Sequence, residues 1–285
     1  MDCACNLLLE RDGMENENVY KGYKRVKGNT EYINNYMECI NRDDWYVNEY
    51  IIINNTDDGT EKEMRWDGNK FVALKLPPSK YIKGRNALQR CALDMLSNPD
   101  ITICAVLGTY GSGKTRLCMS AALRAVTQLG QQTSILGVRP PLGEGREVGY
   151  LPGDLLSKTN MFFMPLAQQL EGGIFELESL QQRGVLDTNI PYYMKGLTAN
   201  YEIILCDEAE DLTEKELRLV GTRVGEGGRI FFSGDYKQGI LDSSENNPLV
   251  KMCNYFKGNK LFACIVLEED VRSETSKLFA DMYLS

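Results

Sequence analysis

The chain has 285 residues, of which 43% are hydrophobic and 25% are charged, a composition typical of a globular protein. It contains no apolar run near the roughly 20 residues that a membrane helix needs, and its first residues do not lead us to expect a secretory leader. We therefore expect a cytoplasmic protein. The net charge of −8 argues against a generally basic nucleic-acid-binding surface, and the lack of histidine excludes any mechanism that needs a histidine base or ligand.

Basic residues outnumber acidic ones only between residues 80 and 165, where 10 basic residues face 5 acidic ones. This local excess indicates one anion-binding site rather than a basic surface. The nine cysteines show no metal-ligand spacing, and several lie in apolar runs, so we expect buried free thiols.

Residues 1–45 are polar, and we interpret them as a connector with a helical pattern only at Thr30–Ile40. Short β-forming runs follow within residues 46–79, separated by Asn, Asp and Gly turn residues. We predict a small antiparallel sheet from the runs Tyr50–Ile53, Lys62–Trp66 and Phe71–Leu74. Pro77 and Pro78 mark its end.

Residues 80–285 alternate between strand and helix patterns and are assigned to one α/β domain. Thr213 and Glu216 form a capping-box pattern before one helix. A second helix is predicted from Leu117, Ala121, Ala125 and Leu129, which recur every four residues and form one face. The predicted strands are Ile101–Leu107, Thr133–Val138, Glu202–Cys206, Arg229–Ser233 and Phe262–Leu267. Strands and helices in alternation predict a mainly parallel sheet of five or more strands between helices.

A glycine-rich segment between the first predicted strand and its helix matches the phosphate-loop pattern G-x-x-x-x-G-K-[ST]. Its backbone amides can surround a phosphate at a helix N-terminus. Lys114 can reach the β- and γ-phosphates, and the Thr115 hydroxyl can ligate Mg²⁺. We assign nucleotide contacts to Gly108, Thr109, Tyr110, Gly111, Ser112, Gly113, Lys114, Thr115 and Arg116. The sequence therefore predicts a RecA-like P-loop NTPase core, preceded by a small β-rich unit, with ATP and Mg²⁺ as its ligands.

Two acidic residues end the apolar run at 202–206. Asp207 is placed to hold Mg²⁺, and Glu208 to accept a proton from an attacking water. The alternative is an N-cap residue with a solvated neighbour. No Asn-Lys-x-Asp motif is present, which disfavours GTP.

Two further residues complete the predicted catalytic set. Gln238 follows the strand at 229–233 and can sense the γ-phosphate; the alternative is a polar turn. Arg272 follows the last strand and is the candidate arginine finger; the alternative is a helix-entry arginine paired with nearby acids. Arg223 is the reserve candidate.

The motifs of residues 84–285 together resemble the ATPase module of the PhoH-like (phosphate-starvation-inducible) family, which is related to superfamily 1 helicases. The segments that carry the resemblance are Gly84–Gln89 with Ala92–Asp94, the phosphate loop, Val138–Pro140, Gly149–Asp154, Asp207–Glu210, Thr222–Gly227, Gly234–Asp235 with Gln238, and Arg272–Glu274. Residues Tyr20–Ile53 are similar to the connector that follows an N-terminal PIN ribonuclease domain in longer members. No four-acid cluster precedes it, so RNA cleavage is not expected.

The resemblance implies roles for several residues. Gln89 would read adenine, as the corresponding glutamine of helicases does. Arg139 and the Gly149–Asp154 loop would line a nucleic-acid path or contact a neighbouring subunit, with Arg146 and Lys158 as further candidates for nucleic-acid contact. A structural Pro-Gly loop with a surface arginine is the alternative.

Superfamily 1 helicases build their site between two such cores, whereas this chain has one. We therefore expect a homo-oligomer, with a ring such as a hexamer supplying the missing face, that acts on RNA or single-stranded DNA. A nucleotide-gated scaffold that binds a protein partner is the alternative, favoured by the acidic balance. A small-molecule kinase is a third reading, weakened by Glu208.

Overall fold

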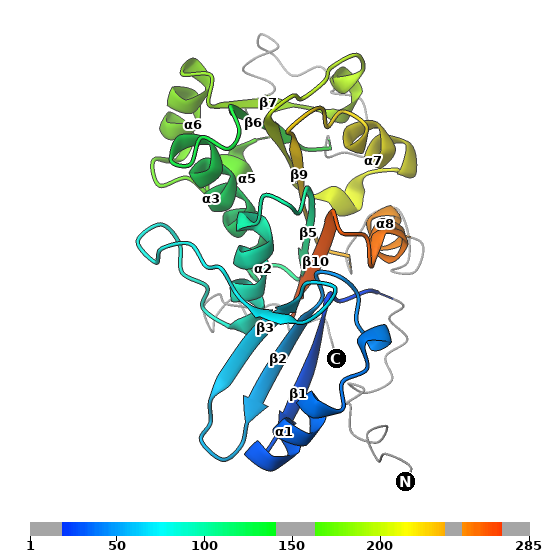
Figure 1. Cartoon of the computed structure of the whole chain (residues 1–285). Coiled ribbons are helices and arrows are strands. Elements are labelled where there is room, and N and C mark those ends of the chain that lie inside the picture. The colour runs from blue at the N-terminus through cyan, green and yellow to red at the C-terminus, as the bar shows by residue number, and fades with distance from the viewer. Residues whose placement is uncertain (1–18, 141–162, 237–246, 270–285) are drawn as a thin grey trace, which may run out of the picture.

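The computed structural model describes residues 19–140, 163–236 and 247–269, which form two β-sheets and the helices around them (Figure 1). The smaller sheet is built from the N-terminal quarter of the chain, and the larger one from the rest. Among the residues described, no helix is both long and apolar enough to span a bilayer.

The small sheet has four strands in the order β1-β2-β3-β4, and it corrects the predicted all-antiparallel unit. Its strands are β1 (Tyr23–Gly28), β2 (Tyr50–Asn55), β3 (Glu61–Trp66) and β4 (Phe71–Ala73). β2, β3 and β4 pair antiparallel, as predicted, but β1 pairs parallel with β2 and comes from the segment interpreted as a connector. A parallel partner needs a crossover, which α1 (Thr30–Glu38) and the turn η2 (Arg42–Asp44) provide.

Side chains alternate between the two faces of strand β2, and both faces are buried. Tyr50 and Ile52 belong to the main apolar core, which they share with the large sheet. Ile51 and Ile53 face the opposite way and pack with Trp66 in a second cluster that α1 covers. The small sheet is thus continuous with the main core.

Asp94 of α2 (Ala87–Ser97) joins the small sheet to the rest of the molecule. Its buried carboxylate accepts hydrogen bonds from the Tyr50 hydroxyl at 2.8 Å, from Arg65 Nε at 3.0 Å and from the Lys75 backbone N–H at 2.6 Å. Three donors on three segments therefore converge on one side chain.

We expect Asp94→Ala to lower the free energy of unfolding by about 3 kcal/mol, because it leaves the Arg65 charge and two other donors unpaired in a buried place. Denaturant unfolding measures this, with the exposed Asp100→Ala as the matched control. Equal effects of the two substitutions would show that Asp94 does not hold the joint.

The large sheet has six parallel strands in the order β10-β5-β9-β8-β6-β7. The strands are β5 (Ile103–Gly108), β6 (Ser134–Val138), β7 (Leu186–Asn189), β8 (Glu202–Cys206), β9 (Arg229–Gly234) and β10 (Phe262–Leu267). The five predicted strands and the parallel arrangement are confirmed. The additional edge strand β7 was missed because its sequence, Leu-Asp-Thr-Asn, has only one apolar residue.

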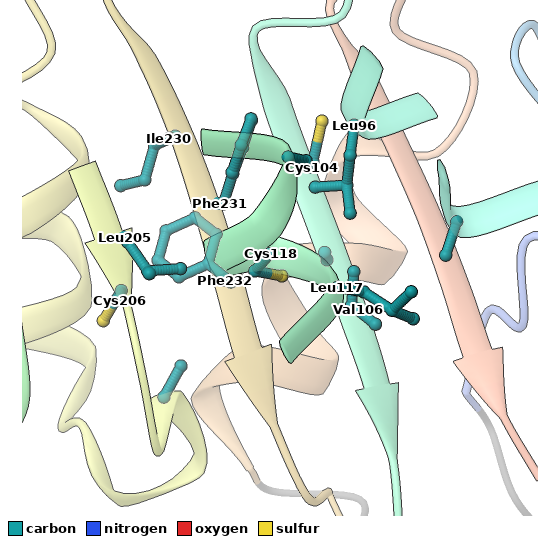
Figure 2. Close-up of a cluster of buried hydrophobic side chains, with 14 of the residues drawn as sticks. Leu96, Cys104, Val106, Leu117, Cys118, Leu205, Cys206, Ile230, Phe231 and Phe232 are labelled. Carbon is teal, nitrogen blue, oxygen red and sulfur yellow. The ribbon is translucent and has the colours of Figure 1, made fainter. Parts of the chain in front are cut away.

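Helices cover both faces of this sheet, with α2 and α3 on one side and α7 and α8 on the other (Figure 1). Figure 2 shows Leu117 and Cys118 of α3 among strand side chains that include Val106 and Phe231. The remaining elements are α3 (Lys114–Thr127), α5 (Met164–Ala167), α6 (Gly173–Gln182), η3 (Pro191–Met194), η4 (Ala209–Asp211), α7 (Glu214–Gly221) and α8 (Pro248–Phe256). The predicted capping box at Thr213 and Glu216 opens α7.

The strand order sets the geometry of the site. Strand β5 leads into the phosphate loop and β8 leads into Asp207, and a single strand, β9, lies between them. Because all three strands are parallel, their carboxyl ends meet at one edge, where ligands of open α/β sheets bind.

Candidate nucleotide-binding and hydrolysis site

All three glycines of the phosphate loop, Gly108, Gly111 and Gly113, have a positive φ. Gly108 ends β5 with φ +145°, and a Cβ there would lie 2.3 Å from the carbonyl oxygen of Leu267 on β10. Gly113 has φ +92° and is the N-cap residue of α3. These conformations curve the loop around the start of α3, where backbone N–H groups lack partners within the helix and can bind an anion.

Lys114, the first residue of α3, folds back over this loop. Its ammonium donates to the carbonyl oxygens of Gly108 at 2.7 Å and Thr109 at 2.9 Å. A cavity of about 180 Å³ opens beside it. The cavity is lined by Tyr110, Gly111, Gly113, Lys114, Thr115, Arg116, Gln169, Asp207, Glu208, Ser233 and Gly234. Most of the predicted loop residues therefore face the same space as the predicted acidic pair.

Thr115, Asp207 and Ser233 form a polar cluster at the floor of this cavity. The Thr115 hydroxyl donates to Asp207 Oδ1 at 2.7 Å, and its oxygen lies 3.1 Å from Ser233 Oγ. Ser233 was not predicted. The sequence shows only a small polar residue near the end of a buried strand. That residue points to the site only once β9 is known to lie between β5 and β8.

Two members of this cluster, the Asp207 carboxylate and the Thr115 hydroxyl, are the donor set that Mg²⁺ prefers beside a phosphate-binding loop. Thr115 and Asp207, the two predicted ligands, are within hydrogen-bonding distance of each other although they are 92 residues apart in the chain. The residues present therefore fit a magnesium ion, with positions left for water and phosphate oxygens.

Glu208 occupies a strained turn between β8 and η4. Its backbone is left-handed, with φ +52° and ψ +44°, which is uncommon for a residue with a side chain. Its side chain is 28% exposed and reaches the cavity, and Oε1 accepts a hydrogen bond from Arg139 Nη2 at 3.0 Å. The predicted base thus lies at the phosphate cavity and is held by an arginine.

Arg139 is buried beside the acidic pair, and its contact with nucleic acid stays a prediction. The residue is 4% exposed, and its guanidinium pairs with Glu208 at 3.0 Å and with Asp207 at 3.6 Å. Strand β6 lies next to β8, so the residue after β6 is placed beside the residues after β8.

Glu210 is a third carboxyl group at this place that the sequence did not single out. Burial, followed by the nearby charge of Glu208, raises the pKa of Glu210 to about 8. Its carboxyl group contacts that of Glu208, and its Oε2 has no hydrogen-bond partner among the described residues. The direction of this shift favours the protonated form of Glu210 near neutral pH.

Because the carboxyl pKa of Glu210 is raised from 4.5 to about 8 on folding, the folded protein keeps a proton between these pH values that the unfolded chain has already lost. We expect the wild type to lose stability as pH rises through this window, at up to about 1.4 kcal/mol per pH unit, and Glu210→Gln to lose less. Unfolding free energies at pH 5, 6.5 and 8 measure the difference, with the exposed Glu178→Gln as control. Parallel pH profiles of wild type and Glu210→Gln would contradict the assignment.

Gln89 lies against the phosphate loop rather than open to solvent. Its Nε2 donates to the Ser112 carbonyl oxygen at 2.8 Å, and its Oε1 accepts from the Arg85 backbone N–H at 2.9 Å. Asn86 caps α2 through the Gln89 backbone N–H. The structure thus gives Gln89 a role in supporting the loop, and adenine reading stays a prediction.

A second cavity of about 680 Å³ adjoins the phosphate cavity and shares Gly111, Gly113, Arg116 and Gln169 with it. Its walls include the Tyr81 ring, which lies 6.0 Å from the Arg124 guanidinium. The sequence missed Tyr81 and Arg124 because neither belongs to a motif.

Four of the predicted residues, Gln238, Arg272, Arg146 and Lys158, lie outside the described residues, as does the Gly149–Asp154 loop. Arg223 is described, and it does not line the phosphate cavity. Its guanidinium donates to the Leu197 carbonyl oxygen at 3.3 Å and to Thr222 Oγ1 at 3.2 Å. The reserve arginine is therefore not directed at this chain's own phosphate cavity.

Comparison with known proteins identifies relatives of this chain. Residues 81–284 match the profile of the family described as PhoH-like protein. Protein PhoH2 of Bacillus subtilis (strain 168) is 28% identical over 291 residues, which cover 94% of this chain and 65% of the relative. Protein PhoH2 of Thermobispora bispora is 31% identical over 206 residues, or 70% of this chain and 47% of the relative.

A solved structure, the flagellar accessory protein FlaH from Methanocaldococcus jannaschii, aligns with 61% of this chain and 76% of its own, at 14% identity and a TM-score of 0.33. That likeness is too distant to bear on function. The chain spans less than two thirds of the length of both PhoH2 relatives. The profile match extends over well more than half of the chain. The chain therefore belongs to the PhoH-like protein family.

Proposed function

We propose that the protein hydrolyses ATP with Mg²⁺ at the cavity between the phosphate loop and the acidic pair. The observation that carries this proposal is the 2.7 Å contact between Thr115 and Asp207, on a cavity that Lys114 and Glu208 also line. A phosphate loop alone would support only nucleotide binding. Glu208 adds the proton acceptor that hydrolysis needs.

The roles follow from the positions of the groups. Backbone N–H groups at the start of α3 bind the β-phosphate, and Lys114 leaves the carbonyl oxygens of Gly108 and Thr109 to contact phosphate oxygens. Thr115 and Asp207 hold Mg²⁺, which when bound neutralises charge on the β- and γ-phosphates. Glu208 orients a water molecule and accepts its proton as the water oxygen bonds to the γ-phosphorus and ADP leaves.

The larger cavity accommodates the nucleoside. It joins the phosphate cavity through Gly111, Gly113 and Arg116, and the Tyr81 ring offers a surface on which an adenine can stack. Gln89 lines the same cavity, so the predicted adenine contact is compatible with this placement.

We further propose that hydrolysis is coupled to movement on, or unwinding of, RNA or single-stranded DNA, within a homo-oligomeric ring in the cytoplasm. The helicase-like motifs support this reading. A single core also leaves the γ-phosphate without an arginine from a facing core, which a neighbouring copy can supply. The second candidate, a nucleotide-gated scaffold for a protein partner, is favoured by the net charge of −8.

Steady-state ATP hydrolysis tests these functions when it is measured with Mg²⁺, without and with single-stranded RNA or DNA, at low and moderate salt. The translocase reading predicts stimulation by one of the nucleic acids that weakens as salt rises. Hydrolysis that neither nucleic acid changes at either salt concentration would favour the scaffold.

A further inference from the structure

Arg139 follows β6 directly, and its place is fixed by the pairing of β6 with β8. Val138 lies opposite Cys206 in the parallel register, and the Asp207 backbone N–H donates to the Val138 carbonyl oxygen at 2.9 Å. The Arg139 backbone N–H in turn donates to the Asn189 carbonyl oxygen at 3.3 Å, at the end of β7. The backbone that bears this guanidinium is therefore fixed by hydrogen bonds among three adjacent strands, β6, β7 and β8.

The closer of its two acidic neighbours is Glu208. Arg139 Nη2 lies 3.0 Å from Glu208 Oε1, whereas Nη1 lies 3.6 Å from Asp207 Oδ2, beyond hydrogen-bonding distance. The other Asp207 oxygen accepts the Thr115 hydroxyl. The carboxylate of Asp207 is thus oriented by Thr115, while that of Glu208 is oriented by Arg139.

A purely stabilising role does not explain this arginine well. Its Nε and Nη1 have no hydrogen-bond partner among the described residues although the side chain is almost wholly buried. Unsatisfied buried donors cost about 1–3 kcal/mol each, and apolar residues often replace buried ion pairs without loss of stability. Arg139 is also absent from the lining of the phosphate cavity, which Glu208 does line. Any effect on a bound nucleotide therefore passes through its acidic neighbours.

The backbone of Glu208 strengthens this argument. Its left-handed conformation costs free energy, on the order of 1 kcal/mol or more for a residue with a Cβ, and such strain is found where a side chain must have one direction. The strained turn fixes the backbone of Glu208, and the ion pair with Arg139 fixes its carboxylate, so the side chain is restrained at both ends.

We propose that Arg139 is a positioning residue that holds the Glu208 carboxylate at the edge of the phosphate cavity, where it accepts the proton of the attacking water. This inference rests on the proposed hydrolysis. Loss of the guanidinium lets the carboxylate rotate away, so turnover falls while the groups that bind phosphate and metal stay in place.

The test compares Arg139→Met, Arg139→Lys and the exposed-surface control Arg183→Met with the wild type. Arg139→Met should lower kcat ~10–100-fold, the scale on which misplacing a catalytic group acts. Its KM for ATP and the Mg²⁺ concentration at half-maximal rate should change less than about twofold, because the groups that bind them are intact. Arg139→Lys should keep part of the wild-type kcat. Arg183→Met should have the wild-type kcat. If Arg139→Met does not unfold cooperatively, Arg139→Gln replaces it.

Single-turnover hydrolysis by Arg139→Met/Glu208→Gln shows whether Arg139 acts through Glu208. If it does, the double variant is no slower than Glu208→Gln alone. A kcat at or above the wild-type value in the folded Arg139 variants, a parallel loss of ATP affinity, or multiplicative losses in the double variant would each overturn the inference and leave the proposed function in place. A wild type that does not hydrolyse ATP would overturn both.

Discussion

Lys114→Ala should abolish ATP hydrolysis, with a fall in kcat/KM of at least about 100-fold, and should weaken nucleotide binding. The ammonium is the one basic group that the structure places within the phosphate loop itself, 2.7 Å from the Gly108 carbonyl oxygen. Removing it deletes the charge that meets the β- and γ-phosphates but leaves the glycine turns unchanged. Binding is measured with a fluorescent ATP analogue, and turnover by phosphate release.

The matched control is Lys215→Ala, on the exposed surface of α7. It changes the net charge by the same amount and should leave both quantities unaltered. Hydrolysis by Lys114→Ala at the wild-type rate would show that turnover does not take place at this loop.

Glu208→Gln should have the second large effect, reducing kcat by about 10²–10⁴-fold while ATP still binds. The amide is nearly isosteric with the carboxylate and can still accept the hydrogen bond from Arg139, but it cannot take a proton from water. Thr115 and Asp207 keep their contact, so Mg²⁺ dependence of binding should persist.

Equilibrium binding and single-turnover hydrolysis separate the two effects, with the exposed Glu178→Gln as control. Loss of binding together with turnover would mean that Glu208 is structural. Full turnover would mean that another group accepts the proton.

The phosphate loop and the acidic pair could be read directly from the sequence because both are local patterns. A G-x-x-x-x-G-K-[ST] run and an apolar run ending in Asp-Glu each carry their own strand context. The structure brings them together through the order of β5, β9 and β8. Local pattern was also enough for the capping box of α7.

Non-local pairing decided the features that the sequence did not reveal. No pattern in Tyr23–Gly28 shows that it pairs parallel with β2 instead of connecting domains. The register of β6 against β8 places Arg139 beside Glu208, and only the fold shows that this arginine is buried. Leu129 continued a helix pattern yet lies beyond the end of α3 and is exposed, because periodicity does not fix where a helix ends.

The roles of Glu210 and Tyr81 also depend on residues that are distant in the sequence. A Glu two residues after Glu208 looks like a solvated surface acid, and its raised pKa appears only once burial and the neighbouring charge are known. Tyr81 lies 27 positions before Gly108, and only the fold shows that it lines the larger cavity together with α3 residues such as Arg124.

The most direct measurement is phosphate release from ATP by the wild-type chain, with Mg²⁺ and with EDTA, beside Lys114→Ala at the same protein concentration. Hydrolysis that requires both Mg²⁺ and Lys114 is the result expected of a site formed by Thr115, Asp207 and Glu208. Release that is no greater than that of Lys114→Ala, without and with single-stranded nucleic acid, would contradict the proposal that this cavity hydrolyses ATP.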